Sequence, residues 1–204
     1  MKIIGIGKNY VNDVSEMPQS VVTPVIFTKP DTSILQHNAD LVLPSFSDNV
    51  WYEIELAFRI GKTCKKATEE NALTFVDAVA LSNDLTAKDV LKQSREPKKG
   101  PWALAKGFDG ATPISEFLPI EQFSDVKDIN FSMTVNGVET QKGNSGLMIT
   151  SLAKIIAYVS GIMTLNSGDI ILSGTPATGA GKINSGDEMI GYLEGKQLLV
   201  TKVK

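Results

Sequence analysis

Apolar and polar side chains alternate along residues 51–62, WYEIELAFRIGK, with the two-residue period of a β-strand. Side chains two positions apart on a strand leave the same face of the sheet. The pattern therefore predicts a strand with one apolar face. It places Glu53 and Glu55 side by side on the other face, about 7 Å apart along the strand.

The other elements that the pattern predicts are mostly short strands. Residues 2–6, 25–28 and 77–82 are apolar runs of strand length, and alternating segments around Asn136 and Gly137 predict a β-hairpin. The clearest helix is predicted over residues 151–163, where apolar residues recur three and four positions apart. Many short strands and few helices predict an α+β fold that is mainly β.

Shorter features complete the prediction. Residues 9–17 and 87–94 are expected to form short helices, and residues 95–101, REPKKGP, a mobile polar loop. The sequence Asn-Ser-Gly-Asp occurs at 166–169 and again at 184–187, each time before a strand. We interpret this repetition as the same turn chemistry used twice.

Composition limits the class of protein. The 204 residues are 42% hydrophobic and 21% charged, which suits a single globular domain over residues 1–204. The net charge of −3 gives no basic surface for nucleic acid or anionic membrane, and the apolar runs are too short to span a bilayer. The single cysteine, Cys64, excludes an internal disulfide and fits a reducing cytoplasm.

The two neighbouring glutamates allow two interpretations. Carboxylates so close repel each other, and a divalent cation between them would remove the conflict. The alternative is a solvated polar face of a half-buried strand. Because His37 is the only histidine and Cys64 the only cysteine, a metal here would have to be held by oxygen ligands. His37 itself is expected to be a surface or loop residue.

Three further features favour a functional site. Asp84 ends a buried apolar run, Lys106 ends the short apolar run WALA, and Gly174 and Thr175 follow the apolar run DIILS. Charged groups in such places usually have a partner. Each also has a simpler explanation, since Asp84 could cap a helix, Lys106 could extend to water, and the glycine could form only a turn.

Five motifs, in this order, carry a family resemblance: YEIELAFRIGK, VALSNDLTAKD, WALAKGFD, VNGVETQKGNS and LNSGDIILSGTP. The chain resembles the fumarylacetoacetate hydrolase family over nearly its whole length, most closely the short acylpyruvate hydrolases and oxaloacetate decarboxylases. The resemblance implies a mixed β-roll and a homodimer.

The resemblance also implies a site. Mg²⁺ or Mn²⁺, with Ca²⁺ a further candidate in crystals, would be bound by Glu53, Glu55 and Asp84. The active-site lysine of the family matches Lys106, and the threonine that contacts substrate matches Thr175, beside Gly174. The small-molecule substrate would be a 2-oxo acid that chelates the metal.

The chain departs from the family where substrate is bound and water is activated. Family hydrolases place a histidine and a glutamate three residues apart on a mobile N-terminal helix, and these positions hold Asp13 and Glu16. We expect residues 8–20 to be a candidate lid and these two residues candidate catalytic bases. The family's arginine is Lys88, which keeps a role in substrate binding, and a glutamine is Leu91.

Three functions remain open at this point. The first is metal-dependent hydrolysis of a carbon–carbon bond in acylpyruvate-like (fumarylacetoacetate-type) ketonic acids through an enolate. The second is decarboxylation or keto–enol tautomerisation of oxaloacetate. The third is a non-catalytic module that binds a metal and a metabolite, with Asp13 as the sign of lost catalysis.

Overall fold

The computed structural model describes residues 1–94 and 102–204, without the side chains of residues 93 and 94. The loop predicted at 95–101 therefore lies outside the described residues. The described strands form sheets of eight, five and three strands, and the predicted fold class, α+β and mainly β, is confirmed.

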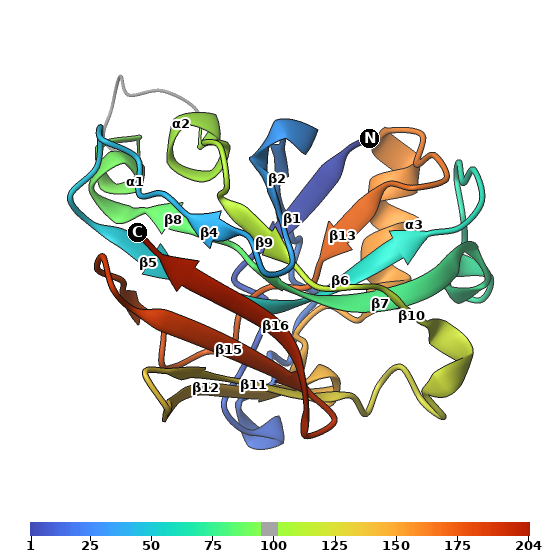
Figure 1. The fold of residues 1–204 in the computed structure, drawn as a ribbon. Helices are drawn as coiled ribbons and strands as arrows, with labels where there is room; N and C mark the ends of the chain where they lie inside the picture. The colour runs from blue at the N-terminus through green and yellow to red at the C-terminus, as the bar shows by residue number, and fades with distance from the viewer. Residues whose placement is uncertain (95–101) are drawn as a thin grey trace.

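Figure 1 shows the eight-stranded sheet running through the centre of the molecule. It consists, in spatial order, of β2 (Val25–Lys29), β1 (Ile3–Gly7), β13 (Ile170–Leu172), β6 (Ile54–Ile60), β7 (Val76–Asn83), β9 (Thr112–Ile114) and β3 (Ile34–Gln36), with β10 (Leu118–Pro119) paired to β7.

The five-stranded sheet consists of β12 (Val138–Asn144), β11 (Asn130–Val135), β15 (Glu188–Leu193), β16 (Lys196–Val203) and β4 (Asp40–Leu41). Four of its strands, β11, β12, β15 and β16, lie below the large sheet in Figure 1. The small sheet consists of β14 (Gly181–Lys182), β5 (Val50–Tyr52) and β8 (Thr86–Ala87). The α-helices are α1 (Lys88–Ser94), α2 (Ala103–Lys106) and α3 (Leu152–Ile162).

The single strand predicted over residues 51–62 is interrupted at Glu53. The backbone N–H of Glu53 donates to Asn83 Oδ1 (2.7 Å), and the N–H of Ile54 donates to Gln141 Oε1 (2.9 Å). Side chains thus replace the strand partners at this point, so β5 leaves the large sheet and pairs with β8 and β14. Alternation alone could not predict the break, because the side chains responsible are distant in sequence.

The helix predicted over residues 9–17 is shorter than expected. Only Val14–Glu16 is helical, as one 3₁₀ turn (η1), and Asp13 caps it by accepting from the N–H of Ser15 (2.9 Å). Asn9 is instead held in place by its backbone, whose carbonyl accepts from the N–H of Ile149 (2.7 Å). The tertiary contact outweighs the weak helical propensity of a polar segment.

The predicted hairpin and repeated turns are confirmed. Asn136 and Gly137 both have positive φ (52° and 79°), as a type I′ turn requires. In the two Asn-Ser-Gly-Asp turns, Asp169 accepts from the N–H of Asn166 and Asp187 from that of Asn184, each at 2.7 Å. The same four residues therefore make the same turn twice.

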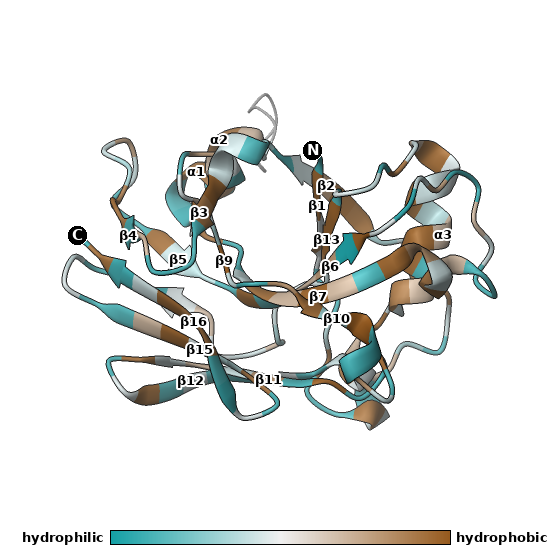
Figure 2. Ribbon diagram, turned by 45° about the vertical axis from the view of Figure 1, so that its right-hand side comes forward, coloured by the Kyte–Doolittle hydropathy of each residue, from teal (hydrophilic) through white to brown (hydrophobic). Residues whose placement is uncertain are grey.

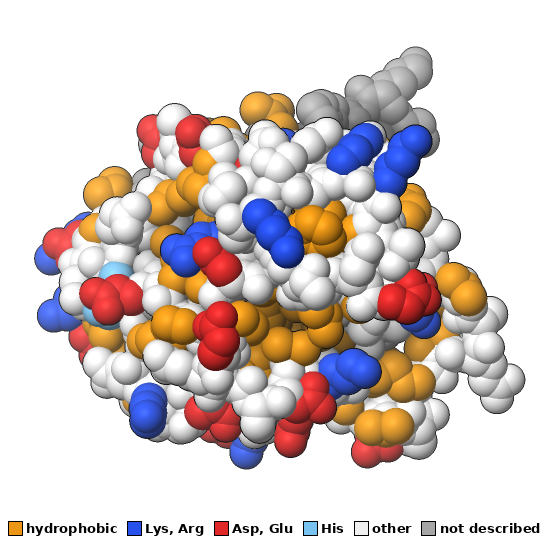
Figure 3. All heavy atoms as spheres, turned by 90° about the vertical axis from the view of Figure 1, so that its right-hand side faces the viewer, with side chains coloured by type: hydrophobic (Ala, Val, Ile, Leu, Met, Phe, Trp, Pro, Cys, Tyr) orange, Lys and Arg blue, Asp and Glu red, His pale blue; other side chains and the backbone are white. Residues whose placement is uncertain are grey.

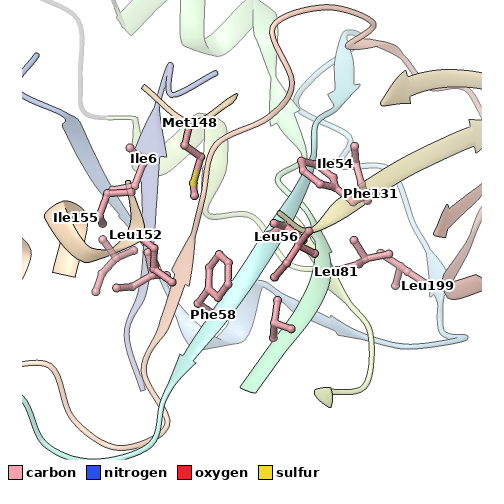
Figure 4. Packing of buried hydrophobic residues seen from close by; sticks show 14 of the residues in the cluster. Ile6, Ile54, Leu56, Phe58, Leu81, Phe131, Met148, Leu152, Ile155 and Leu199 are labelled. Atoms are coloured by element: carbon pink, nitrogen blue, oxygen red, sulfur yellow. The ribbon is translucent and has the colours of Figure 1, made fainter. Parts of the chain in front are cut away.

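The core lies between the large sheet, the five-stranded sheet and α3. Figure 2 shows the hydrophobic stretches concentrated on the central strands, and Figure 4 shows Leu152 and Ile155 of α3 near Ile6. The sheets approach closely at Gly191 of β15, where a Cβ would lie 3.1 Å from Leu81 Cδ1 and 3.3 Å from Ile54 Cδ1. This contact fixes β15 against β6 and β7.

The surface shown in Figure 3 carries acidic and basic side chains intermixed, in agreement with the small net charge. Within the described ranges, no helix is both long enough and apolar enough to cross a membrane.

Candidate active site

A cavity of about 330 Å³ lies beside the large sheet at the ends of β1, β6, β7 and β13. Acidic and basic side chains make one part of its wall, namely Glu53, Glu55, Asp84, Lys88 and Lys106. Apolar residues, among them Ile6, Phe27, Leu91 and Trp102, make another part. A cavity of this size and mixed lining is typical of a small-molecule site.

The three carboxylates predicted as metal ligands come together here. One oxygen of each of Glu53, Glu55 and Asp84 lies within 4.8 Å of the others, and all three side chains are buried. The antiparallel pairing of β6 with β7 explains this arrangement, since it places Ile54 opposite Asn83. The N–H of Asp84 then donates to the carbonyl of Glu53 (2.8 Å), which joins the two segments just beyond the strands.

Lysines surround the carboxylates. Lys106 Nζ donates to Glu53 Oε2 (2.8 Å) and to Asp84 Oδ2, so its ammonium bridges two carboxylates. Lys88 Nζ donates to the other oxygen of Glu53. Lys29 Nζ donates to Asp84 Oδ1 (2.5 Å) and to the carbonyl of Ala111 (2.7 Å). Three lysines are thus bonded to Glu53 and Asp84.

Sequence reasoning missed Lys29, whose side chain is fully buried. The available signal was its place at the end of the apolar run VIFT, the same kind of place that drew attention to Asp84. Phe27, two positions earlier on β2, was also missed. Its ring centroid lies 4.8 Å from Lys106 Nζ, so one face of β2 supports both Asp84 and Lys106.

Gly174 and Thr175 form the opposite side of the cluster. The N–H of Gly174 donates to Glu55 Oε2 (2.8 Å), and Gly174 has a φ of 96° that favours glycine. Thr175 Oγ1 accepts from Gln141 Nε2 (2.8 Å), which leaves the threonine proton to donate elsewhere. Gln141 was not singled out in the sequence, although it lies in the motif VNGVETQKGNS.

Burial and charge shift the acidity of these groups in opposite directions. Burial, reinforced by the negative charge of Asp84, raises the pKa of Glu55 well above its ordinary value. Burial also disfavours ionisation of Asp84, but Lys106 and Lys29 outweigh it and hold its pKa below normal. Burial acts against the charge of Lys106, yet Asp84 and Glu53 raise its pKa overall. The site thus shifts Asp84 and Lys106 toward their charged forms and Glu55 toward its protonated form.

The residues present fit a hard divalent cation. Three carboxylates supply the oxygen ligands that Mg²⁺ and Mn²⁺ prefer, and the ammonium of Lys106 already bridges two of them. A cation among these oxygens would also oppose the effects of burial and of the negative charge of Asp84, which together raise the pKa of Glu55. Glu53, Glu55 and Asp84 are the residues that would hold it.

A family model for the fumarylacetoacetate hydrolase C-terminal domain matches residues 2–204. The chain belongs to the fumarylacetoacetate hydrolase family. It is 39% identical over 204 residues to the mitochondrial oxaloacetate tautomerase FAHD1 of Bos taurus, covering 99% of this chain and 91% of that one. It is 38% identical over 200 residues to the oxaloacetate tautomerase YcgM of Escherichia coli K12, covering 97% and 90%.

Solved structures of this enzyme family show the same fold. A fumarylpyruvate hydrolase from Pseudomonas aeruginosa, in complex with Mn²⁺ and pyruvate, superposes with a TM-score of 0.90 at 30% identity, covering 100% of this chain and 89% of that one. A 5-carboxymethyl-2-hydroxymuconate delta-isomerase from Mycobacterium smegmatis gives a TM-score of 0.90 at 34% identity, covering 99% and 78%.

The structure of this family member does not bring all predicted site residues together. Asp13 is exposed and accepts from Ser15 Oγ (2.6 Å), and Glu16 is exposed and accepts from the N–H of Asn12 (3.0 Å). Neither is among the described residues that line the cavity, whereas Lys88, Leu91 and Thr175 are. Catalytic roles for Asp13 and Glu16 remain predictions.

Proposed function

We propose that this protein catalyses keto–enol tautomerisation of an oxaloacetate-like 2-oxo acid with the help of Mg²⁺ or Mn²⁺. The observation that carries the proposal is the position of Lys106, whose ammonium faces the cavity between Glu53 and Asp84. The named activity of the tautomerase relatives, at 38–39% identity over nearly the full chain, supports the same reaction.

The chemistry needs negative charge to be stabilised on the substrate's keto oxygen. A cation held by Glu53, Glu55 and Asp84 would act there as a Lewis acid. Lys106, kept charged by its carboxylate neighbours, donates an N–H to the same oxygen as the enolate develops. Removing one such donor typically lowers kcat by about 10² to 10³.

Thr175 orients the substrate. Its hydroxyl oxygen accepts from Gln141, so its proton is directed toward another acceptor, which the substrate carboxylate would provide. Lys88 binds Glu53 and lines the cavity, and it contributes positive charge near that carboxylate. Asp13 and Glu16 lie within six residues of Tyr10, which lines the cavity, so closure of residues 11–20, the part of the predicted lid beyond Tyr10, would bring them toward substrate as bases.

Hydrolysis of an acylpyruvate is the second candidate. It is favoured by the close structural match to a fumarylpyruvate hydrolase holding Mn²⁺ and pyruvate. Hydrolysis needs a base to activate water, and that function would fall to Asp13 or Glu16. Decarboxylation of oxaloacetate would release CO₂ and leave the enolate of pyruvate, whose negative charge develops on the same keto oxygen.

Product analysis separates these reactions. With Mg²⁺, tautomerisation is followed by the ultraviolet absorbance of enol-oxaloacetate, decarboxylation by CO₂ release, and hydrolysis by free pyruvate from an acylpyruvate. We expect Lys106→Met to abolish turnover and Lys154→Met, at an exposed position on α3, to retain it. Full turnover by Lys106→Met would remove Lys106 from the mechanism. Binding of Mg²⁺ and oxalate with no turnover would leave only the non-catalytic module.

A further inference from the structure

Lys8 is the lysine of the cavity that the site described above does not use. It belongs to the segment GIGKNY, immediately after β1, and its exposed side chain lines the cavity. Lys88 and Lys106 also line the cavity, but both are bonded to Glu53. Lys8 makes no hydrogen bond or ion pair with any residue that the structure describes.

The backbone at Lys8 is nevertheless fixed. The next residue, Asn9, is buried, and its Nδ2 donates to the carbonyls of Ser173 (2.8 Å) and Thr150 (3.1 Å). Asn9 Oδ1 accepts from the N–H of Thr150 (2.8 Å). The chain therefore presents the Lys8 ammonium from a rigid position, so little ordering of the backbone opposes binding of an anion.

Elsewhere in the site, Lys29, Lys88 and Lys106 are each bonded to Glu53 or Asp84, whereas no acidic side chain among the described residues pairs with Lys8. Much of the remaining lining is apolar, from Ile6, Phe27, Leu91 and Trp102. An anionic group of the substrate that lies away from the three carboxylates could therefore pair with the ammonium of Lys8.

We propose that Lys8 binds the distal carboxylate of the substrate and so selects dicarboxylic 2-oxo acids over those with an apolar end. This inference rests on the proposed function, because it assumes that the 2-oxo acid group lies beside Lys106 and Thr175. A hydrogen bond to a charged group contributes enough to change affinity about tenfold to a hundredfold.

The test compares two substrates that differ only at that end. Oxaloacetate carries a carboxylate where 2-oxobutanoate carries a methyl group. For both we would measure deuterium exchange at C3 by NMR and binding by competition with oxalate, which has no distal carboxylate. The proteins are the full chain with Mg²⁺, as wild type, Lys8→Met, Lys8→Arg and the surface control Lys154→Met.

The expected result is a loss of preference in Lys8→Met. Its affinity for oxaloacetate should fall about tenfold or more, while its affinities for 2-oxobutanoate and oxalate stay unchanged. Lys8→Arg should keep the preference, because it keeps the charge. Equal losses for all three ligands, or no loss for any, would overturn the assignment.

The two proposals fail in different ways. If the wild type exchanges neither substrate but Lys8→Met selectively loses oxaloacetate binding, the tautomerase activity is wrong and the role of Lys8 stands. If the wild type exchanges both substrates and Lys8→Met leaves their ratio unchanged, the activity stands and the role of Lys8 is wrong.

Discussion

Glu55 is the residue whose charge state depends most on what the site binds. Its side chain is buried beside two carboxylates, and burial together with the negative charge of Asp84 raises its pKa above that of an exposed glutamate. A divalent cation bound there would oppose this shift, because it would favour the ionised form. Binding of a metal would therefore be coupled to loss of a proton from this residue.

The coupling predicts that metal affinity rises with pH. The pKa of Glu55 is higher in the folded than in the unfolded protein, so protonation of Glu55 stabilises the folded state. This stabilisation is fully present below about pH 4.3 and is lost as the pH rises through the folded pKa. Calorimetric titration of Mn²⁺ in buffers of different ionisation enthalpy should show proton release. An affinity that is constant from mildly acidic to mildly alkaline pH would contradict the coupling.

Replacement of Lys29 is expected to lower the free energy of unfolding. Its fully buried ammonium donates to Asp84, so in Lys29→Met the lysine that still bonds this carboxylate, among the described residues, is Lys106. Breaking a buried pair costs about 3–5 kcal/mol, and we expect a loss near the lower end in urea unfolding. The matched control is Lys204→Met, whose exposed pair with Asp40 should cost about 1 kcal/mol or less. Equal stability of Lys29→Met and wild type would show that Lys29 does not hold Asp84.

At the scale of elements, the break between β5 and β6 shapes the site. Alternation in the sequence placed Glu53 and Glu55 near each other, and this holds, although Glu53 lies between two strands. What alternation could not show is that Gln141, from a hairpin 87 positions away, bonds the backbone at Ile54. Long-range side-chain contacts of this kind have no periodic signature.

Removal of the Gln141 side chain is expected to lower the free energy of unfolding. It accepts from the buried N–H of Ile54 and donates to Thr175, so Gln141→Ala leaves a buried donor unsatisfied. The expected loss of unfolding free energy is about 1–3 kcal/mol, with a higher KM because Thr175 is no longer oriented. Lys142→Ala, at the exposed neighbouring position, should change neither quantity. If the two variants behave alike, the bond does not support the site.

At the scale of the whole molecule, the family, the mainly β architecture and the gathering of the acidic residues could be predicted from five ordered motifs. The support behind them could not, because Lys29 and Phe27 act through a strand that carries no functional motif of its own. Likewise, the exposure of Asp13 and Glu16 depends on how residues 11–24 leave the core, which short-range patterns do not determine.

We propose that the chain is a homodimer. One stretch of the chain exposes several valines, namely Val14, Val21, Val22 and Val25, and Val21 is 95% exposed. Apolar side chains gathered on a surface in this way often mark a protein–protein interface. Light scattering after size-exclusion chromatography should give twice the chain mass of 22.0 kDa. Val21→Asp should shift the protein toward the monomer. A wild-type mass of 22.0 kDa at every concentration would contradict the dimer.

The metal site is tested most directly by a titration of Mn²⁺ into metal-free protein, followed by electron paramagnetic resonance. We expect one tightly bound ion per chain, with affinity at least about a hundredfold weaker in Asp84→Asn. Asp77→Asn, a half-exposed carboxylate paired with Arg59 outside the cavity lining, should bind like the wild type. The absence of binding to the wild type, or equal binding by Asp84→Asn, would contradict a metal site among Glu53, Glu55 and Asp84.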